Sequence, residues 1–217
     1  MTGRVVSLQV GQPRLVRHDG ESVSTAIFKD AVDGPRHLRR LGFEGDGQAD
    51  LANHGGLDQA AYLYPREHYA FWAARLPARI GEAGLFGENL TTEGLLESNV
   101  CYGDEFRLGG ARVQVTTPRV PCFKLGIRTG DPGIVKPFLA SGRLGFYLRV
   151  LAEGPVAAGD PIERTVADPY GLAMADLIAA LFLPDPAPAE LARILAVPTL
   201  HPKHRARLEA RRAGHDA

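Results

Sequence analysis

Most of the chain carries short runs in which hydrophobic and polar residues alternate, a pattern typical of β-strands with one buried face. Glycine and proline follow most of these runs and end them. Residues 107–117 hold two such runs around Gly109 and Gly110, which predicts a hairpin. The other strands are predicted at residues 5–10, 22–29, 36–43, 60–64, 145–151 and 161–166.

Helical spacing of apolar residues is confined to shorter segments. After Pro65 this spacing predicts a helix over residues 66–76, and a second short helix is predicted over residues 132–140. The composition changes near residue 167, after which proline breaks separate three short helical patterns. We therefore expect a mainly β domain with some α-helix over residues 1–167 and a small helical appendage over residues 168–217.

The composition is that of a soluble globular protein. Of the 217 residues, 45% are hydrophobic and 23% are charged. Lysine plus arginine and aspartate plus glutamate both number 25, which gives no reason to expect binding to a nucleic acid polymer or a membrane surface. The first residues lack the apolar run of a signal peptide, and no stretch approaches the about 18 apolar residues of a membrane span. A cytoplasmic location is expected.

The cysteine content limits the redox chemistry that the chain can perform alone. Its two cysteines, Cys101 and Cys122, form no CxxC pair, which excludes a thioredoxin-like motif and a zinc ribbon. An iron–sulfur cluster held by cysteines needs more of them than the chain has. Any redox reaction would therefore take its electrons from another protein. Cys101 lies in an ordinary turn sequence and is interpreted as a packing residue.

The segment around Cys122 is the most informative part of the sequence. Pro118 and Pro121 force the backbone out of regular strand pairing and present Cys122 at a strand end. Two nearby cations, Arg119 and Lys124, lower the pKa of a thiol and favour the thiolate, which attacks electrophiles or ligates metal. An isolated cysteine is more often a small buried residue. The flanking charges and prolines favour the reactive interpretation here.

A glycine-rich segment is the second candidate for a ligand site. The sequences GDGQAD at residues 45–50 and HGG at 54–56 let backbone approach a ligand closely and can form an anion nest. A pair of tight turns explains the same glycines, and the spacing matches neither GxGxxG nor a P-loop. His54 has little apolar pattern around it, so a dyad with Cys122 stays open. Asn89 either donates to a ligand oxygen or forms a turn.

Six stretches taken together resemble the MOSC-domain family, named for the C-terminal domain of molybdenum cofactor sulfurase, and most closely its YiiM-like subgroup. Their order along the chain is that of the family, and the helical tail resembles the three-helix appendage of the subgroup. The stretches are GDGQAD (45–50), HGG (54–56), YPREHY (64–69), FGENL (86–90), ESNVCYGD (97–104) and PRVPCFKL (118–125).

The resemblance implies a MOSC-type β-barrel with a molybdenum cofactor (molybdopterin) in a central cleft, and Cys122 as the thiolate ligand of the metal. Soft thiolate ligands suit such a site. The implied activity is reduction of N-hydroxylated compounds, including purine bases such as 6-hydroxylaminopurine, to the amine and water. The implied residues are Cys122, His54 and Asn89 for catalysis and Arg119, Lys124, Gly55, Gly56 and Asp46 for holding the cofactor.

Partners and alternatives follow from the same resemblance. Some relatives carry a fused iron–sulfur domain, which this chain lacks, so a separate reductase is expected as electron donor. The helical tail is expected to dock that donor or to form a homodimer. A sulfur carrier with a persulfide on Cys122 is the main alternative, and a non-catalytic binding module is a third hypothesis. At the level of the family, pyridoxal phosphate binding is also implied.

Overall fold

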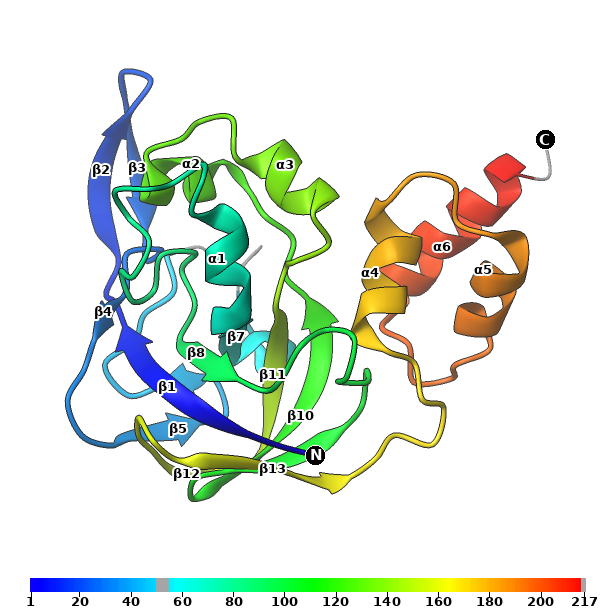
Figure 1. Ribbon diagram of the computed structural model, residues 1–217, viewed down its shortest axis with the longest axis horizontal. Helices are drawn as coiled ribbons and strands as arrows, with labels where there is room; N and C mark the ends of the chain where they lie inside the picture. Colours follow the sequence, from blue (N-terminus) through cyan, green and yellow to red (C-terminus); the bar gives the residue numbers. More distant parts are fainter. Residues whose placement is uncertain (50–54, 216–217) are drawn as a thin grey trace.

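Seven strands of the described residues close into a β-barrel in the computed structural model, which describes residues 1–49 and 55–215 (Figure 1). Neighbouring barrel strands are antiparallel except β7 and β8, which are parallel. The mainly β barrel expected from the sequence is confirmed. In ring order the strands are β13 (Pro161–Val166), β9 (Glu105–Leu108), β10 (Ala111–Pro118), β11 (Phe146–Ala152), β7 (Ala61–Pro65), β8 (Leu90–Glu93) and β1 (Thr2–Val10).

The barrel interior follows from the alternation seen in the sequence. Along β10 the side chains of Ala111, Val113 and Val115 are buried, while Arg112 between them is exposed. All five residues of β7 are buried, because helices and loops cover its outer face. Burial on both faces explains why the sequence of β7 is a continuous apolar run rather than an alternating one.

Shorter strands lie outside the barrel ring. The strands β2 (Arg14–His18) and β3 (Glu21–Thr25) form a protruding hairpin, and β4 (Asp30–Ala31) pairs with β1. The strand predicted over 22–29 therefore ends at Thr25. The single strand predicted over 36–43 is wrong, because the backbone turns and Gly42 takes a φ of 142°. It is a small hairpin of β5 (Arg36–Arg39) and β6 (Gly42–Phe43), joined by β12 (Gly154–Val156).

Helices near the barrel are shorter than the sequence pattern predicts. The helix expected over 66–76 consists of η2 (Arg66–His68) and α1 (Tyr69–Trp72), and turns follow it. Trp72 packs its ring 5.3 Å from that of Phe138 in α3 (Val135–Ala140), and its Nε1 donates to the hydroxyl of Tyr64 at 2.8 Å. Aromatic packing, rather than helix length, therefore holds this segment. Two further elements, η1 (Leu57–Gln59) and α2 (Phe123–Thr129), are not predicted by the sequence pattern.

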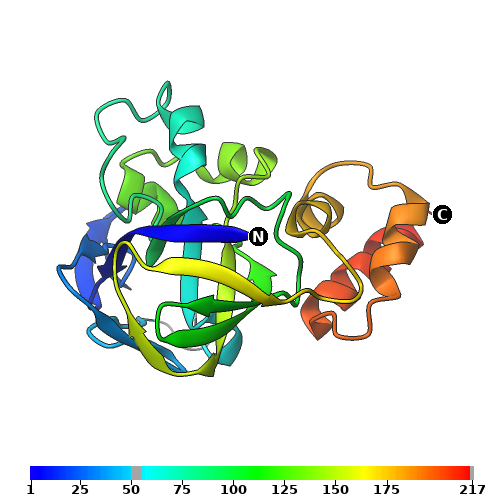
Figure 2. The same cartoon turned by 60° about the horizontal axis from the view of Figure 1, so that its bottom comes forward.

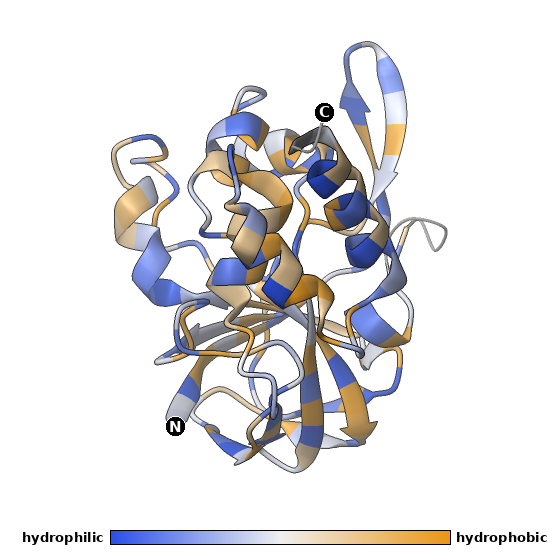
Figure 3. Cartoon of the chain, turned by 90° about the vertical axis from the view of Figure 1, so that its right-hand side faces the viewer, coloured by the Kyte–Doolittle hydropathy of each residue, from blue (hydrophilic) through white to orange (hydrophobic). Residues whose placement is uncertain are grey.

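The C-terminal appendage consists of the three predicted helices, α4 (Met174–Phe182), α5 (Pro188–Leu195) and α6 (Pro202–His215), set beside the barrel (Figures 1 and 2). Backbone hydrogen bonds join it to the barrel, with Tyr102 N–H donating to the Leu172 carbonyl at 2.8 Å. In Figure 3 the helix nearest the C-terminus, α6, is largely hydrophilic. Within the described residues no helix is both long and apolar enough to cross a membrane. Separate folding of the two parts, divided after residue 167, stays a prediction.

Gly145 illustrates how tightly β11 approaches β7, and a matched pair of substitutions measures this constraint. Gly145 and Gly142 both have positive φ, 64° and 67°. A Cβ at Gly145 would lie 2.3 Å from the Leu63 carbonyl oxygen, whereas one at Gly142 would meet nothing within 4 Å. Gly145→Ala should therefore lower the free energy of unfolding about 1–3 kcal/mol more than Gly142→Ala in urea titrations. Equal losses would show that φ alone matters.

Candidate functional site

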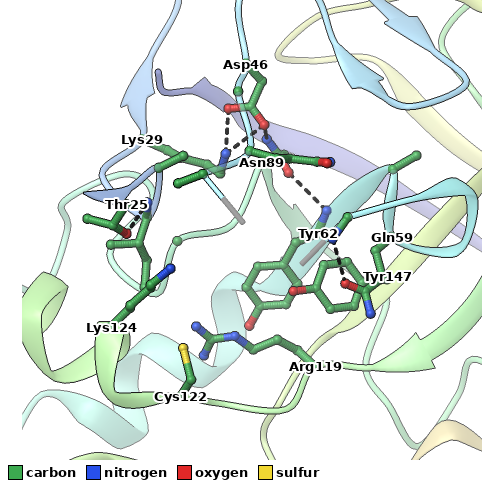
Figure 4. Close-up of a pocket in the computed structure, with 18 of the residues that line it drawn as sticks. Thr25, Lys29, Asp46, Gln59, Tyr62, Asn89, Arg119, Cys122, Lys124 and Tyr147 are labelled. Atoms are coloured by element: carbon green, nitrogen blue, oxygen red, sulfur yellow. Dashed lines mark hydrogen bonds and ion pairs between the residues drawn. The ribbon is translucent and has the colours of Figure 1, made fainter. Parts of the chain in front are cut away.

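A cavity of about 750 Å³, counted with its open mouth, lies at one end of the barrel strands. Strand register explains its position, because one row of paired residues crosses four strands. The row consists of Pro118, Phe146, Leu63 and Leu90. The sequence neighbours of these residues line the cavity: Arg119, Tyr147, Tyr62 and Asn89 (Figure 4).

Cys122 enters the cavity from the segment between β10 and α2. The strand β10 ends at Pro118, as the prolines predicted, and Cys122 is the N-terminal cap of α2 with extended backbone (φ −124°, ψ 176°). Its carbonyl accepts a hydrogen bond from Leu125 N–H at 2.9 Å. In Figure 4 its sulfur is directed toward the guanidinium group of Arg119. The thiol therefore lies beside a cation from the same connecting segment.

Arg119 is a buried cation with unused hydrogen-bonding capacity. The residue is 5% exposed, and its Nη1 has no hydrogen-bond partner among the described residues. Its guanidinium carbon lies 5.2 Å from the ring centre of Tyr62 and 5.3 Å from that of Phe138. Buried donors are nearly always paired, and an unpaired one needs a specific explanation. An anionic ligand in the cavity would supply the missing acceptor.

Two tyrosines, Tyr62 and Tyr147, form a wall of the cavity. Burial raises the pKa of both hydroxyls, and the nearby charge of Arg119 opposes this without reversing it. Both side chains therefore keep their protons at neutral pH. The Tyr62 hydroxyl donates to the Leu144 carbonyl at 2.7 Å, which fixes its ring.

A buried ion pair forms the opposite side of the cavity. The Nζ of Lys29 lies 2.5 Å and 2.7 Å from the two carboxylate oxygens of Asp46, and both side chains are 9% exposed. Asp46 also accepts from Gly11 N–H at 2.7 Å. Burial lowers the pKa of Lys29, and the charge of Asp46 opposes that shift. Among the described lining residues, Lys29, Arg119 and Lys124 outnumber the one carboxylate, so the cavity favours an anion.

Asn89 connects the ion pair to the barrel. Its Nδ2 donates to Asp46 at 2.8 Å and to the Gln9 carbonyl at 3.3 Å, and its Oδ1 accepts from Tyr62 N–H at 3.1 Å. Both amide hydrogens are thus engaged, so the side chain positions Asp46. A catalytic role for Asn89 stays a prediction.

Most of the residues predicted from the sequence meet in this cavity. Gly55 lines the cavity with φ 107°, and a Cβ there would clash with the Gln48 side-chain amide oxygen. Gly56 caps η1 with φ 89° and is not among the lining residues. His54 lies outside the described residues. The predicted residues that the cavity brings together are Asp46, Gly55, Asn89, Arg119, Cys122 and Lys124.

Sequence reasoning missed several lining residues. Lys29 follows the apolar run Ala26, Ile27 and Phe28 and carries no motif of its own. Its one signal is a lysine at the end of a largely apolar segment, which is common on protein surfaces. Other missed lining residues with polar side chains include Thr25, Gln59, Tyr62 and Tyr147.

Cys101 has a different environment from Cys122. It forms an isolated β-bridge with Ala173, and its N–H donates to the carboxylate of Asp104 at 3.0 Å. Burial, followed by the charge of Asp104, raises the pKa of its thiol. A protonated, half-buried thiol in this position agrees with the packing interpretation.

Comparison with known proteins identifies a family and several relatives. The model of the MOSC domain matches residues 50–163. The chain is 48% identical over 159 residues to the uncharacterized protein YflK of Bacillus subtilis, covering 73% of this chain and 72% of that protein. It is 43% identical over 164 residues to protein YiiM of Escherichia coli, covering 75% and 68%. A protein named reductase in Gibberella moniliformis is 37% identical over 162 residues, covering 73% of this chain and 29% of that protein.

A solved structure agrees with the fold over nearly the whole chain. The crystal structure of YiiM from Geobacillus stearothermophilus superposes with a TM-score of 0.78 at 31% identity, covering 97% of this chain and 99% of that one. The superposition includes the appendage as well as the barrel, since it extends well beyond the residues that the family model matches.

Removing only one charge of the Lys29–Asp46 pair should strongly lower the free energy of unfolding. Lys29→Met leaves a buried carboxylate without its cation, and we expect unfolding in urea to show a loss of about 3–5 kcal/mol. The double variant Lys29→Met with Asp46→Asn removes both charges and should recover most of that loss. Arg39→Met breaks solvent-exposed ion pairs with Glu44 and Glu153, so it should change stability by less than about 1 kcal/mol. A double variant as unstable as Lys29→Met would contradict charge pairing as the cause.

Proposed function

This chain belongs to the MOSC domain family, and on that premise we propose that it is a molybdenum-cofactor-dependent reductase of N-hydroxylated compounds. The proposed substrates are N-hydroxylated purine bases such as 6-hydroxylaminopurine. In the reaction the N–O bond breaks, two electrons and two protons are taken up, and the products are the amine and water. The observation that carries the proposal is the buried Arg119 beside the thiol of Cys122, because its Nη1 has no hydrogen-bond partner among the described residues.

The residues of the cavity fit the cofactor. Cys122 would supply the soft sulfur ligand that molybdenum accepts. Arg119 and Lys124 would hold the anionic phosphate of the pterin by charge-assisted hydrogen bonds. When bound, the cofactor would supply the two-electron exchange that N–O cleavage needs.

The roles of the remaining cavity residues follow from their own contacts and protonation states. Asn89 holds Asp46, and Asp46 holds Lys29, so the ammonium group is fixed in the cavity wall. Tyr147 retains its proton at neutral pH and can donate to a polar atom of the substrate. Tyr62 and the ring of Phe138 pack against Arg119 and keep water from its guanidinium.

The comparisons support a redox role in a limited way. The relative from Gibberella moniliformis is named a reductase, and the matched region is 29% of it. The two cysteines of this chain are too few for an iron–sulfur cluster. We therefore propose that the electrons come from a separate reductase.

The decisive experiment loads the full chain with molybdenum cofactor and measures molybdenum content and the reduction of 6-hydroxylaminopurine with an artificial electron donor. Stoichiometric molybdenum and formation of adenine are expected. Absence of bound molybdenum together with a persulfide on Cys122 in the mass spectrum would overturn the proposal in favour of sulfur transfer. Neither metal nor persulfide would favour a non-catalytic binding module.

The two cysteines provide a matched pair. Cys122→Ser should abolish N-hydroxy reduction and lower molybdenum content, while its melting temperature stays close to that of the parent protein. Cys101→Ser should retain both activity and metal, because Cys101 lines neither the cavity nor the space beside it. Similar losses in both variants would show that the thiol ligand has been assigned to the wrong residue.

Two buried arginines give a second pair. Arg119→Met should weaken cofactor binding tenfold or more, since a charge-assisted hydrogen bond contributes about 1.5–3 kcal/mol. It should destabilise the cofactor-free protein little, because it removes a buried charge that forms no ion pair with any described residue. Arg128 is 7% exposed, and its donors bond to Gly84 and Glu82 at 3.1 Å.

Arg128→Met should therefore lower the melting temperature and leave cofactor affinity nearly unchanged. Calorimetric unfolding and cofactor titration measure the two quantities separately. If Arg119→Met lowers stability as Arg128→Met does and leaves affinity intact, Arg119 is a structural residue.

A further inference from the structure

A second, wider cavity lies between the barrel and the C-terminal appendage. This outer groove has an open volume of about 2200 Å³. It shares residues with the inner cavity described above, among them Cys122, Lys124 and Tyr147. Its far side comes from the appendage, through Phe182 on α4 and Lys203 on α6. The groove therefore connects the predicted reactive thiol to the helices that the family model does not match.

The outer groove is strongly basic. Its described lining contains Lys124, Arg149, Lys203 and Arg207, and the one carboxylate among them is Asp58. Asp58 is already used, because it accepts from Arg149 Nε at 2.7 Å. Lys203 is exposed and makes no ion pair with any described residue. The cations left in excess favour an anionic ligand.

Two polar groups of the groove lack partners. Thr117 is 6% exposed, and its hydroxyl forms no hydrogen bond within the described part of the chain. The Nε2 of His204 is buried and equally unpartnered. Burial, followed by the charges of His201 and Arg207, lowers the pKa of His204 to about 4, so its ring is neutral at pH 7. A ligand with both donors and acceptors would satisfy these groups.

Aromatic surface lies next to the cations. Phe123 follows Cys122 directly, lines the groove and is 51% exposed. On the appendage side, the Arg207 guanidinium lies 4.8 Å from the ring centre of Phe182 and its Nε is held by the Leu181 carbonyl. A nucleobase stacks on such aromatic surface, and each stacked base contributes about 1–3 kcal/mol.

We propose that the outer groove binds a purine nucleotide, with the base beside Phe123 and the phosphate held by Lys203 and Arg207. This inference rests on the proposed function. It makes N-hydroxylated purine nucleotides, rather than the free bases alone, the substrate class. The same N–O bond breaks and the same water leaves. The phosphate takes no part in the reaction and serves to hold the substrate.

Isothermal titration of the full chain without cofactor tests the site directly. AMP should bind at least tenfold more tightly than adenosine, and inorganic phosphate should compete with it. Lys203→Glu should weaken AMP binding at least tenfold and leave adenosine binding unchanged. The variant should fold, since a glutamate is favourable in the first turn of a helix. Lys136→Glu, an exposed lysine on α3 outside both cavities, is the matched control and should have no effect.

Three outcomes would overturn the inference. Equal affinities for AMP and adenosine would exclude a phosphate subsite. Equal effects of Lys203→Glu and Lys136→Glu would show a nonspecific charge effect. The third outcome combines two results: AMP does not bind, and Lys203→Glu slows turnover with a protein electron donor but not with an artificial one. Together they would show that the groove binds the electron-donor protein.

The titrations also separate this inference from the proposed function, because they need neither molybdenum nor turnover. Reduction of the free base without AMP binding would leave the reductase intact and exclude the nucleotide site. AMP binding to a protein that takes up no molybdenum would support the nucleotide site and exclude the proposed reductase.

Discussion

Closure of the barrel depends on β1, which pairs along both of its edges. Leu8 lies opposite Leu90 of β8, and Thr2 lies opposite Glu163 of β13, close to the end of the barrel sequence. Because the ring satisfies the backbone groups of its strands internally, irregular backbone is left to the loops and strand ends. The chemistry-bearing side chains lie at such places, with Asn89 just before β8 and Cys122 just after β10. A rigid ring thus holds residues that are far apart in sequence.

Most of the fold can be predicted from the sequence, and the predictions that are wrong have physical causes. Alternation locates the barrel strands, but the pairing of Thr2 with Glu163 leaves no local signal. The helix α2 is not predicted because it has only seven residues and Gly126, in its middle, lowers helix propensity. A Cβ at Gly126 would lie 3.1 Å from the Asp131 carbonyl oxygen, so glycine fits this position better than a larger residue. Local preference gives way to close packing at this position.

The candidate site was predictable where its residues sit in unusual sequence. Prolines and charges mark Cys122 and Arg119, and glycines mark the loop of Asp46 and Gly55. Lys29 is different, because its place in the cavity depends on a carboxylate 2.5 Å away that approaches only in the folded chain. Burial of a lysine is unfavourable without such a partner. Long-range pairs of this kind are invisible to any analysis of sequence windows.

The residues common to the inner cavity and the outer groove have a thermodynamic consequence. Cys122, Lys124 and Tyr147 border both spaces, so two molecules bound there would touch the same side chains. We therefore expect a ligand in one space to change the affinity of a ligand in the other. Linkage requires that the factor by which the first ligand changes the affinity for the second equals the factor by which the second changes the affinity for the first. The shared side chains alone can therefore couple ligand binding in the inner cavity to ligand binding in the outer groove.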